Sequence, residues 1–219
     1  MKQAEHTNMI QLMQAGYNDL KAGHTEQACE HWWKLWQAIK EVMRTEGPDT
    51  MEAFDEELTG GPEPVYNWSS DFDMALANLS DEHSNWAERR LAFCSEYLAS
   101  SSDKDDYNQW NRRQTIAEMH YKLGDAPKGN ELFEAYLKEN PEWGWGWMAW
   151  SDMYWLFGEP ELRDTDRAIH ILKQALEHVQ EREERTEIMD RLNTLYIERG
   201  MTDEADAVSK AQRAMYGEL

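Results

Sequence analysis

Apolar residues recur every three or four positions along nearly the whole chain, and no stretch alternates apolar and polar residues as a strand would. This period predicts helices with one buried face, and glycine and proline mark where they stop, as at Gly47-Pro48, Gly60 to Pro64 and Asn140-Pro141. The chain is therefore predicted to be all-α. We expect ten helices, over residues 4–22, 25–45, 65–79, 83–100, 105–123, 126–139, 143–157, 163–179, 183–199 and 202–216.

Four glycines follow helices, and similar residues surround them at fixed offsets: Gly23, Gly124, Gly158 and Gly200. Three positions are compared for each glycine: seven residues before it, five after it and nine after it. They hold Gly16, Ala28 and Trp32 around Gly23; Ala117, Gly129 and Phe133 around Gly124; and Asn193, Ala205 and Ser209 around Gly200. Around Gly158 the match after the turn resumes only at Ala168, because five residues are inserted in EPELRDTDR. Small residues let two antiparallel helices approach closely, and glycine can take the left-handed conformation that ends the first helix.

Units with these offsets and a period of roughly 34 residues resemble the tetratricopeptide repeat, over about two thirds of the chain. The resemblance implies a right-handed superhelix of about ten helices in antiparallel pairs. Two positions depart from the family pattern: Asp19 stands in place of a tyrosine and Ser209 in place of a bulky residue. Residues 139–158 also resemble the helical region that precedes the SEC-C zinc motif in some bacterial proteins. The chain ends in AQRAMYGEL without the cysteines and histidines of that motif, so no zinc role is carried over.

Residues 47–64 interrupt the repeats, and MEAFDEEL within them predicts a short helix followed by a loop. We expect a helical hairpin over 1–46, this irregular segment over 47–64, and a helical array over 65–219, all in one continuous domain. The alternative is a hairpin hinged to a compact array that begins at 63. Helices 65–79 and 83–100 are interpreted as a degenerate repeat without a turn glycine.

The net charge of −21 argues against nucleic acid and anionic membranes as partners and favours a basic protein or peptide. The alternative is that the charge only keeps an exposed helical array soluble. No run approaches ~18 consecutive apolar residues, and the start MKQAEHTNMI lacks an apolar signal core, so a cytoplasmic location is expected. Cys29 and Cys94 lie among apolar neighbours and are interpreted as small core residues.

Signatures of catalysis and metal binding are weak. Seven histidines are scattered without HExxH or a His–Cys cluster, and Gly60-Gly61-Pro62 is not followed by the lysine of a phosphate loop. Adjacent acids such as Glu183 and Glu184 point in different directions on a helix. We expect no catalytic residue, no cofactor and no metal. A carboxylate-based enzyme with a cleft between helices is the minor alternative.

The family resemblance implies where a ligand would bind, because the first helix of each repeat lines a concave groove. The positions that match hold aromatic and charged residues: Tyr17, Lys21, Glu118, Tyr121, Lys122, Trp145, Asp152, Trp155 and Glu187. We therefore predict a non-catalytic scaffold that binds a protein or peptide through an aromatic and acidic groove. Trp147, Trp150 and Tyr154 share another helix face and are expected in the core. The second hypothesis is self-assembly, including a homodimer, through an aromatic terminal face that carries Trp33.

Overall fold

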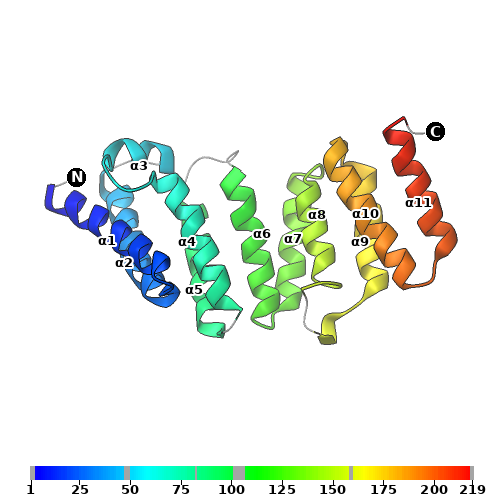
Figure 1. The fold of residues 1–219 in the computed structure, drawn as a ribbon, viewed down its shortest axis with the longest axis horizontal. Helices are drawn as coiled ribbons and strands as arrows, with labels where there is room; N and C mark the ends of the chain where they lie inside the picture. The colour runs from blue at the N-terminus through cyan, green and yellow to red at the C-terminus, as the bar shows by residue number, and fades with distance from the viewer. Residues whose placement is uncertain (1–2, 47–49, 82, 101–106, 158–159, 218–219) are drawn as a thin grey trace. The chain divides into compact units, whose positions relative to one another are not determined.

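The computed structural model describes residues 3–46, 50–81, 83–100, 107–157 and 160–217, and every regular element in these ranges is a helix (Figure 1). The prediction of an all-α fold of the helical-repeat class is confirmed. The elements are α1 (Gln3–Lys21), α2 (Thr25–Glu46), α3 (Met51–Glu57), α4 (Val65–Ser80), α5 (Ser84–Ser100), α6 (Tyr107–Lys122), α7 (Ala126–Glu139), α8 (Gly144–Asp152), the 3₁₀ turn η1 (Pro160–Leu162), α9 (Thr165–His178), α10 (Arg182–Glu198) and α11 (Thr202–Met215).

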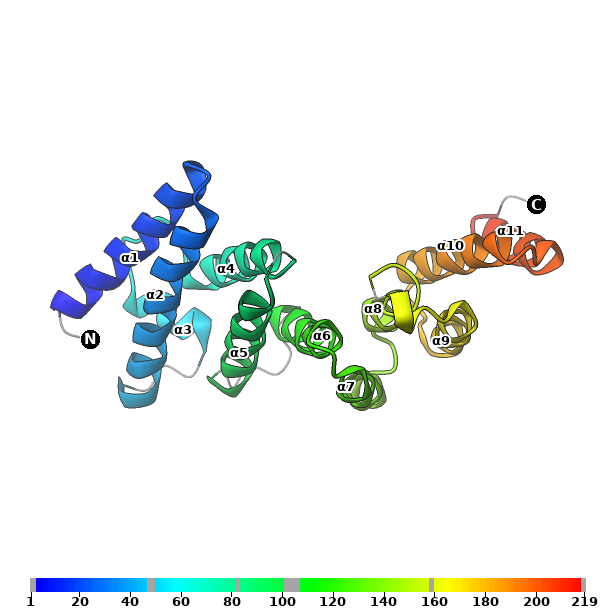
Figure 2. The ribbon, with the colours of Figure 1, turned by 90° about the horizontal axis from the view of Figure 1, so that it is seen from below.

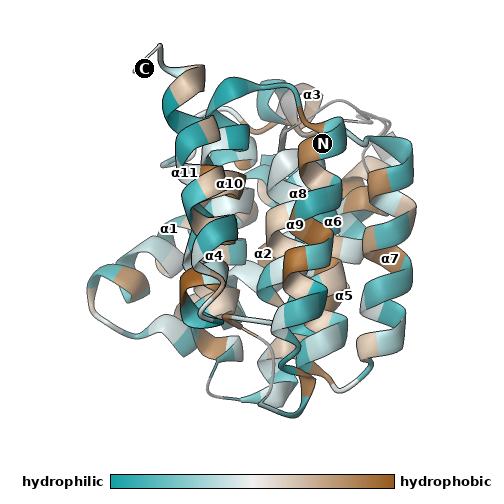
Figure 3. Ribbon diagram, turned by 90° about the vertical axis from the view of Figure 1, so that its right-hand side faces the viewer, coloured by the Kyte–Doolittle hydropathy of each residue, from teal (hydrophilic) through white to brown (hydrophobic). Residues whose placement is uncertain are grey.

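Helices that are neighbours in the chain pack together: α1 on α2, α4 on α5, α8 on α9 and α10 on α11. Contacts of α2 with α4 and of α9 with α10 join one pair to the next, and α7 packs on α8. Each helix can bury an apolar face because polar and apolar residues alternate around it, as the teal and brown bands on α7 show (Figure 3).

Three of the four turn glycines adopt the predicted left-handed conformation. The φ angles of Gly23, Gly124 and Gly200 are +81°, +85° and +70°. A Cβ atom added at any of the three would meet nothing within 4 Å, so the backbone angle, and not lack of space, requires glycine there. Gly158, the fourth, lies outside the described residues, as does Gly47-Pro48.

The chain divides into two compact units, Met1–Met119 and His120–Leu219, with the division inside α6 and not at residues 47–64. Residues 50–64 belong to the first unit because α3, the short helix expected in MEAFDEEL, packs on α4. The Thr50 hydroxyl caps α3 by accepting the Ala53 N–H at 3.0 Å, and Met51, Phe54 and Leu58 are buried.

The N-terminal unit is built around the indole of Trp32, which is fully buried. Its Nε1 donates to the Met13 carbonyl at 3.2 Å, and its ring packs edge-on against Tyr17, Trp68 and Phe72. A Cβ atom on Gly16 would lie 2.1 Å from Nε1 of Trp32. The small residue expected at this position is therefore required for the close approach of α1 to α2.

A buried ion cluster joins α4, α5 and α6 in this unit. The Asp73 carboxylate accepts from Arg90 Nε at 2.9 Å and lies 3.0 Å from Arg112 Nη1, and the Cys94 thiol donates to it at 3.4 Å. Burial alone would raise the pKa of Asp73, but the guanidinium groups of Arg112 and Arg90 outweigh burial and hold the pKa below its ordinary value. Cys94 is buried, as expected, and its free thiol has a pKa raised by burial.

In the C-terminal unit, α8 is shorter than the range 143–157 predicted for it. Figure 2 shows α8 nearly end-on, with α7, α9 and α10 as its neighbours. The Asp152 carbonyl accepts the N–H groups of both Leu156 and Phe157, at 2.8 and 2.9 Å, which closes a turn and ends the helix. The inserted residues that follow contain η1, and the Asp164 carboxylate then caps α9 by accepting the Arg167 N–H at 3.0 Å.

Candidate functional site

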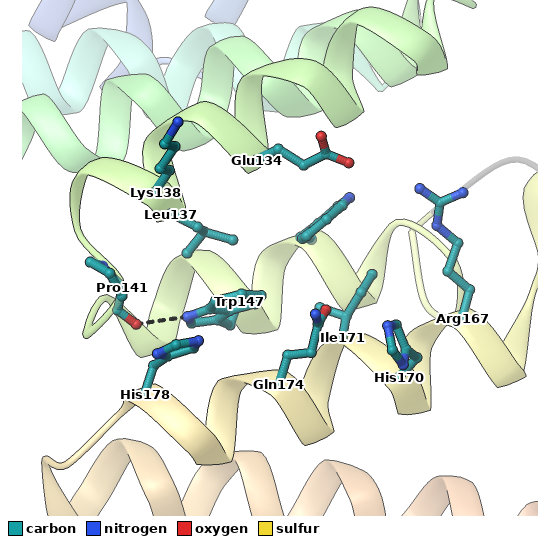
Figure 4. A pocket seen from close by; sticks show the side chains of 11 residues that line it. Glu134, Leu137, Lys138, Pro141, Trp147, Arg167, His170, Ile171, Gln174 and His178 are labelled. Carbon is teal, nitrogen blue, oxygen red and sulfur yellow. Dashed lines mark hydrogen bonds between the residues drawn. The ribbon is translucent and has the colours of Figure 1, made fainter.

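A pocket of about 720 Å³ opens between α7 and α9 in the C-terminal unit, with α8 behind it (Figure 4). This volume lies within the range of about 300–1,000 Å³ that is usual for ligand sites. The lining residues are Glu134, Leu137, Lys138, Pro141, Trp147, Trp150, Arg167, His170, Ile171, Gln174 and His178.

Two indoles of α8 form the apolar base of the pocket. Trp147 and Trp150 are each 7% exposed, so the sequence-based expectation that they belong to the core is confirmed, but each also lines the pocket. The indole N–H groups are occupied within the protein, because Trp147 donates to the Pro141 carbonyl at 2.9 Å and Trp150 to Asn130 Oδ1 at 2.8 Å. What remains for a ligand is therefore ring surface, held in fixed positions.

Glycines in the sequence GWGW allow α8 to take this position. A Cβ atom on Gly146 would lie 2.2 Å from the Trp143 ring, and one on Gly144 would lie 2.5 Å from the Glu184 carboxylate. The Gly144 N–H is donated to that same carboxylate at 3.1 Å, which fixes the start of α8 beside α10. Burial raises the pKa of Glu184, and the Gly144 N–H opposes this shift.

The rim of the pocket is polar and differs in charge from the rest of the chain. Arg167, His170, Gln174 and His178 come from one face of α9, and Glu134 and Lys138 come from α7 (Figure 4). The rim thus holds one carboxylate against an arginine and a lysine, although acids outnumber bases by 43 to 22 in the chain. Within the described residues, neither Arg167 nor Lys138 forms an ion pair with a carboxylate at the pocket.

Near Arg167, four hydrogen-bond donors converge on one acceptor atom, the side-chain oxygen of Asn130. Asn130 Oδ1 accepts from the hydroxyls of Tyr121 and Tyr154, each at 2.6 Å, from Trp150 Nε1 at 2.8 Å and from Arg167 Nη2 at 3.1 Å. An amide oxygen has two lone pairs, so four donors exceed what it can satisfy. Arg167 is the exposed member of the four, and its guanidinium also lies 4.5 Å from the centre of the Tyr154 ring.

The groove residues predicted in the first unit are only partly available to a ligand. Tyr17 is half-buried and donates to Asp71 Oδ2 at 2.7 Å, and burial raises its pKa. Lys21 is exposed at the end of α1. Glu118 accepts from Gln114 Nε2 at 2.8 Å.

In the second unit, two of the predicted groove residues are buried, which corrects the expectation that they are exposed. Tyr121 is 3% exposed because its hydroxyl is tied to Asn130, and Asp152 is 4% exposed and lies 3.5 Å from Arg191 Nε. Burial raises the pKa of Asp152, and Arg191 opposes this shift.

The remaining predicted groove residues are accessible. Trp145 is 49% exposed, Glu187 is exposed and 3.4 Å from Arg191, and Lys122 is half-buried. Trp155 donates from Nε1 to Glu198 Oε2 at 3.1 Å. Trp155 is thus joined to α10 through Glu198, and α8, which carries Trp145, packs on α10, which carries Glu187. Tyr17, Lys21 and Glu118 belong to the other unit.

Sequence reasoning did not find the α7–α9 pocket. Its only sequence signal is the spacing of polar residues on α9, since Arg167, His170, Gln174 and His178 recur every three or four positions beside apolar Ile171. Such a pattern is also typical of an ordinary solvated helix face.

Other candidate chemistry is not found in the part of the chain that the structure describes. No three His, Cys, Asp or Glu side chains there gather in a way that could hold a metal ion. No described helix combines the length and the apolar content that a bilayer span requires.

Comparison with known proteins assigns the chain to no family. No protein-family model matches the chain, and no curated protein matches it. Among solved structures, the crystal structure of BtubC (BKLC) from P. vanneervenii is similar, with 14% identity, a TM-score of 0.43, and coverage of 100% of this chain and 94% of that chain. A similarity at this level carries no argument about function.

Proposed function

We propose that this protein is a non-catalytic binding module of tetratricopeptide-like repeats that captures a segment of a protein partner in the α7–α9 pocket. The observation that carries the proposal is the indole base of Trp147 and Trp150 in an open pocket of about 720 Å³. The left-handed glycine turns at Gly23, Gly124 and Gly200 support the repeat type. A cytoplasmic location belongs to the same proposal, because two free buried thiols suit a reducing compartment.

The two indoles of the pocket are already held in place before a ligand binds. Large aromatic rings dominate binding energies when they are already fixed, because little rotamer entropy is lost on association. Trp147 is fixed by its bond to the Pro141 carbonyl and by stacking on His178, with ring centres 5.8 Å apart and planes 7° apart. Trp150 is fixed by Asn130 and stacks on Phe133 at 6.2 Å. An apolar side chain that enters the pocket meets a surface that needs no rearrangement.

The test is a selection of short random peptides on the full chain, followed by affinity measurements on a variant with a filled pocket. Gln174→Trp places a bulky ring in the pocket from a half-exposed position on α9. The matched control is Lys173→Trp, which adds the same ring one residue away on the exposed side of the helix. We expect the filled variant to weaken selected peptides by at least about tenfold, about 1.4 kcal/mol, and the control to leave them unchanged.

Circular dichroism and thermal unfolding serve as controls that both variants, Gln174→Trp and Lys173→Trp, are folded. Selection that yields no peptide, or peptides bound equally by both variants, contradicts the proposed pocket.

A second candidate surface is the part of the predicted acidic and aromatic groove that Trp145 of α8 and Glu187 of α10 would form for a basic partner. The observation in its favour is Trp145, which is 49% exposed, together with the exposed carboxylate of Glu187. Trp145→Ala separates the two candidates, because it removes a ring from this face and leaves every residue lining the α7–α9 pocket in place. Selected peptides that are rich in Lys and Arg and lose affinity in this variant would favour the second surface.

A further inference from the structure

We infer that the α7–α9 pocket selects a peptide segment in which a large apolar side chain stands next to a carboxylate, and that Arg167 binds that carboxylate. The inference rests on the proposed function and names the chemistry of its ligand. It differs from the basic partner that the net charge suggests, because it follows from the charges at the pocket itself.

The base of the pocket fits a large apolar side chain of the ligand. Leu137 and Ile171 flank the indoles of Trp147 and Trp150, and Figure 4 shows Leu137 and Ile171 on opposite sides of the opening. The indole N–H groups already have acceptors, so the base of the pocket offers no hydrogen bond. An apolar side chain loses nothing by entering, whereas a polar one would be left without partners.

Arg167 has hydrogen-bond donors to spare for a ligand. Asn130 Oδ1 receives four donors, and the contact with Arg167 is the longest of them at 3.1 Å. A guanidinium has five N–H donors, and Arg167 has no carboxylate partner among the described residues. A ligand carboxylate can therefore take N–H groups that the protein leaves unused, in the two-pronged geometry that arginine favours.

The position of Arg167 suits a carboxylate beside the apolar side chain. Arg167 stands at one end of the opening, and Trp147, Pro141 and His178 stand at the other (Figure 4). Its guanidinium is held in place by the Tyr154 ring and by Asn130, so the cation does not have to be ordered when the ligand arrives. Glu134 is the one carboxylate of the lining, and it disfavours a second acid on the α7 side of the ligand.

The experiment uses peptides selected on the full chain whose binding is lost in Gln174→Trp, which restricts it to ligands of this pocket. Each peptide is compared with a version in which its Asp or Glu is replaced by Asn or Gln. Both versions are titrated against the native chain and against Arg167→Gln, which keeps a donor but removes the charge. The control is Arg163→Gln, an exposed arginine of the preceding loop that does not line the pocket.

We expect the selected peptides to be enriched in Asp or Glu beside a large apolar residue. The amide version should bind the native chain on the order of tenfold more weakly, and Arg167→Gln should remove most of that difference, while Arg163→Gln should keep it. Peptides that need the pocket but show no acid enrichment, or no loss on amide substitution, overturn this inference and leave the proposed function standing. Failure to obtain any pocket-dependent peptide overturns both.

Discussion

At the scale of single residues, the most constrained side chain is Asp73, which is the one carboxylate in contact with both Arg90 and Arg112 within the described residues. Asp73→Asn removes the carboxylate that contacts both guanidinium groups, and that of Arg112 is fully buried. We expect it to lower the free energy of unfolding by about 3–5 kcal/mol at neutral pH, as measured by urea denaturation. Asp206→Asn, on the exposed side of α11, is the control and should change stability by less than about 0.5 kcal/mol.

The same residue sets a dependence on pH whose sign follows from its pKa. The folded pKa of Asp73 lies below the ordinary value of 3.8, so its ionised form stabilises the fold above about pH 4. This contribution is lost as the pH falls through the folded pKa. The unfolding free energy of the native chain should therefore fall more steeply below pH 4 than that of Asp73→Asn. Equal slopes for the two proteins would show that Asp73 is not held in its ionised form by the two arginines.

The turn glycines give a second test at this scale. Gly124→Ala meets no neighbour, but its φ of +85° is unfavourable for a residue with a Cβ atom, and we expect a loss of about 1–2 kcal/mol. Gly124→Asn should lose less, because asparagine visits this conformation more readily. Thermal unfolding of the two variants measures the difference, and a smaller loss for alanine than for asparagine would contradict the argument.

At the scale of elements, α9 carries most of the polar rim of the pocket, and the start of α9 depends on one cap. Asp164→Ala removes the carboxylate that accepts the Arg167 N–H, and should destabilise the protein by about 1 kcal/mol. Asp164→Asn keeps an acceptor and should recover most of that loss. Thr202→Ala is the matched control, because α11 has no side-chain cap at its start and the change there should be small.

Most elements could be predicted from sequence because each helix carries its own period and its own stop. The end of α8 could not, because it depends on the Asp152 carbonyl, which any residue type at that position would supply. The burial of Tyr121 depends on Asn130, a residue of the next helix. The pocket depends on the spacing between α7 and α9, which no local pattern in either helix encodes. Sequence periodicity thus reveals which face of a helix is apolar, but not which neighbour covers it.

At the scale of the whole molecule, packing joins helices that are close in the chain, so stability is expected to be local. A substitution in the N-terminal unit should chiefly affect that unit. Asp73→Asn should lower hydrogen-exchange protection in α4 and α5 more than in α10 and α11, as resolved by mass spectrometry of peptic fragments. Equal loss in all four helices would indicate a single cooperative transition instead.

Both cysteines of the chain, Cys29 and Cys94, are buried in the N-terminal unit. Burial also raises the pKa of Cys29, to about 12, and that of Cys94, so little reactive thiolate is present at neutral pH. An alkylating reagent can therefore label them only while that half of the molecule is transiently open. Residues 120–219 contain no cysteine, so the rate of labelling measures the transient opening of the N-terminal unit alone. No cysteine has to be introduced into the protein for this measurement.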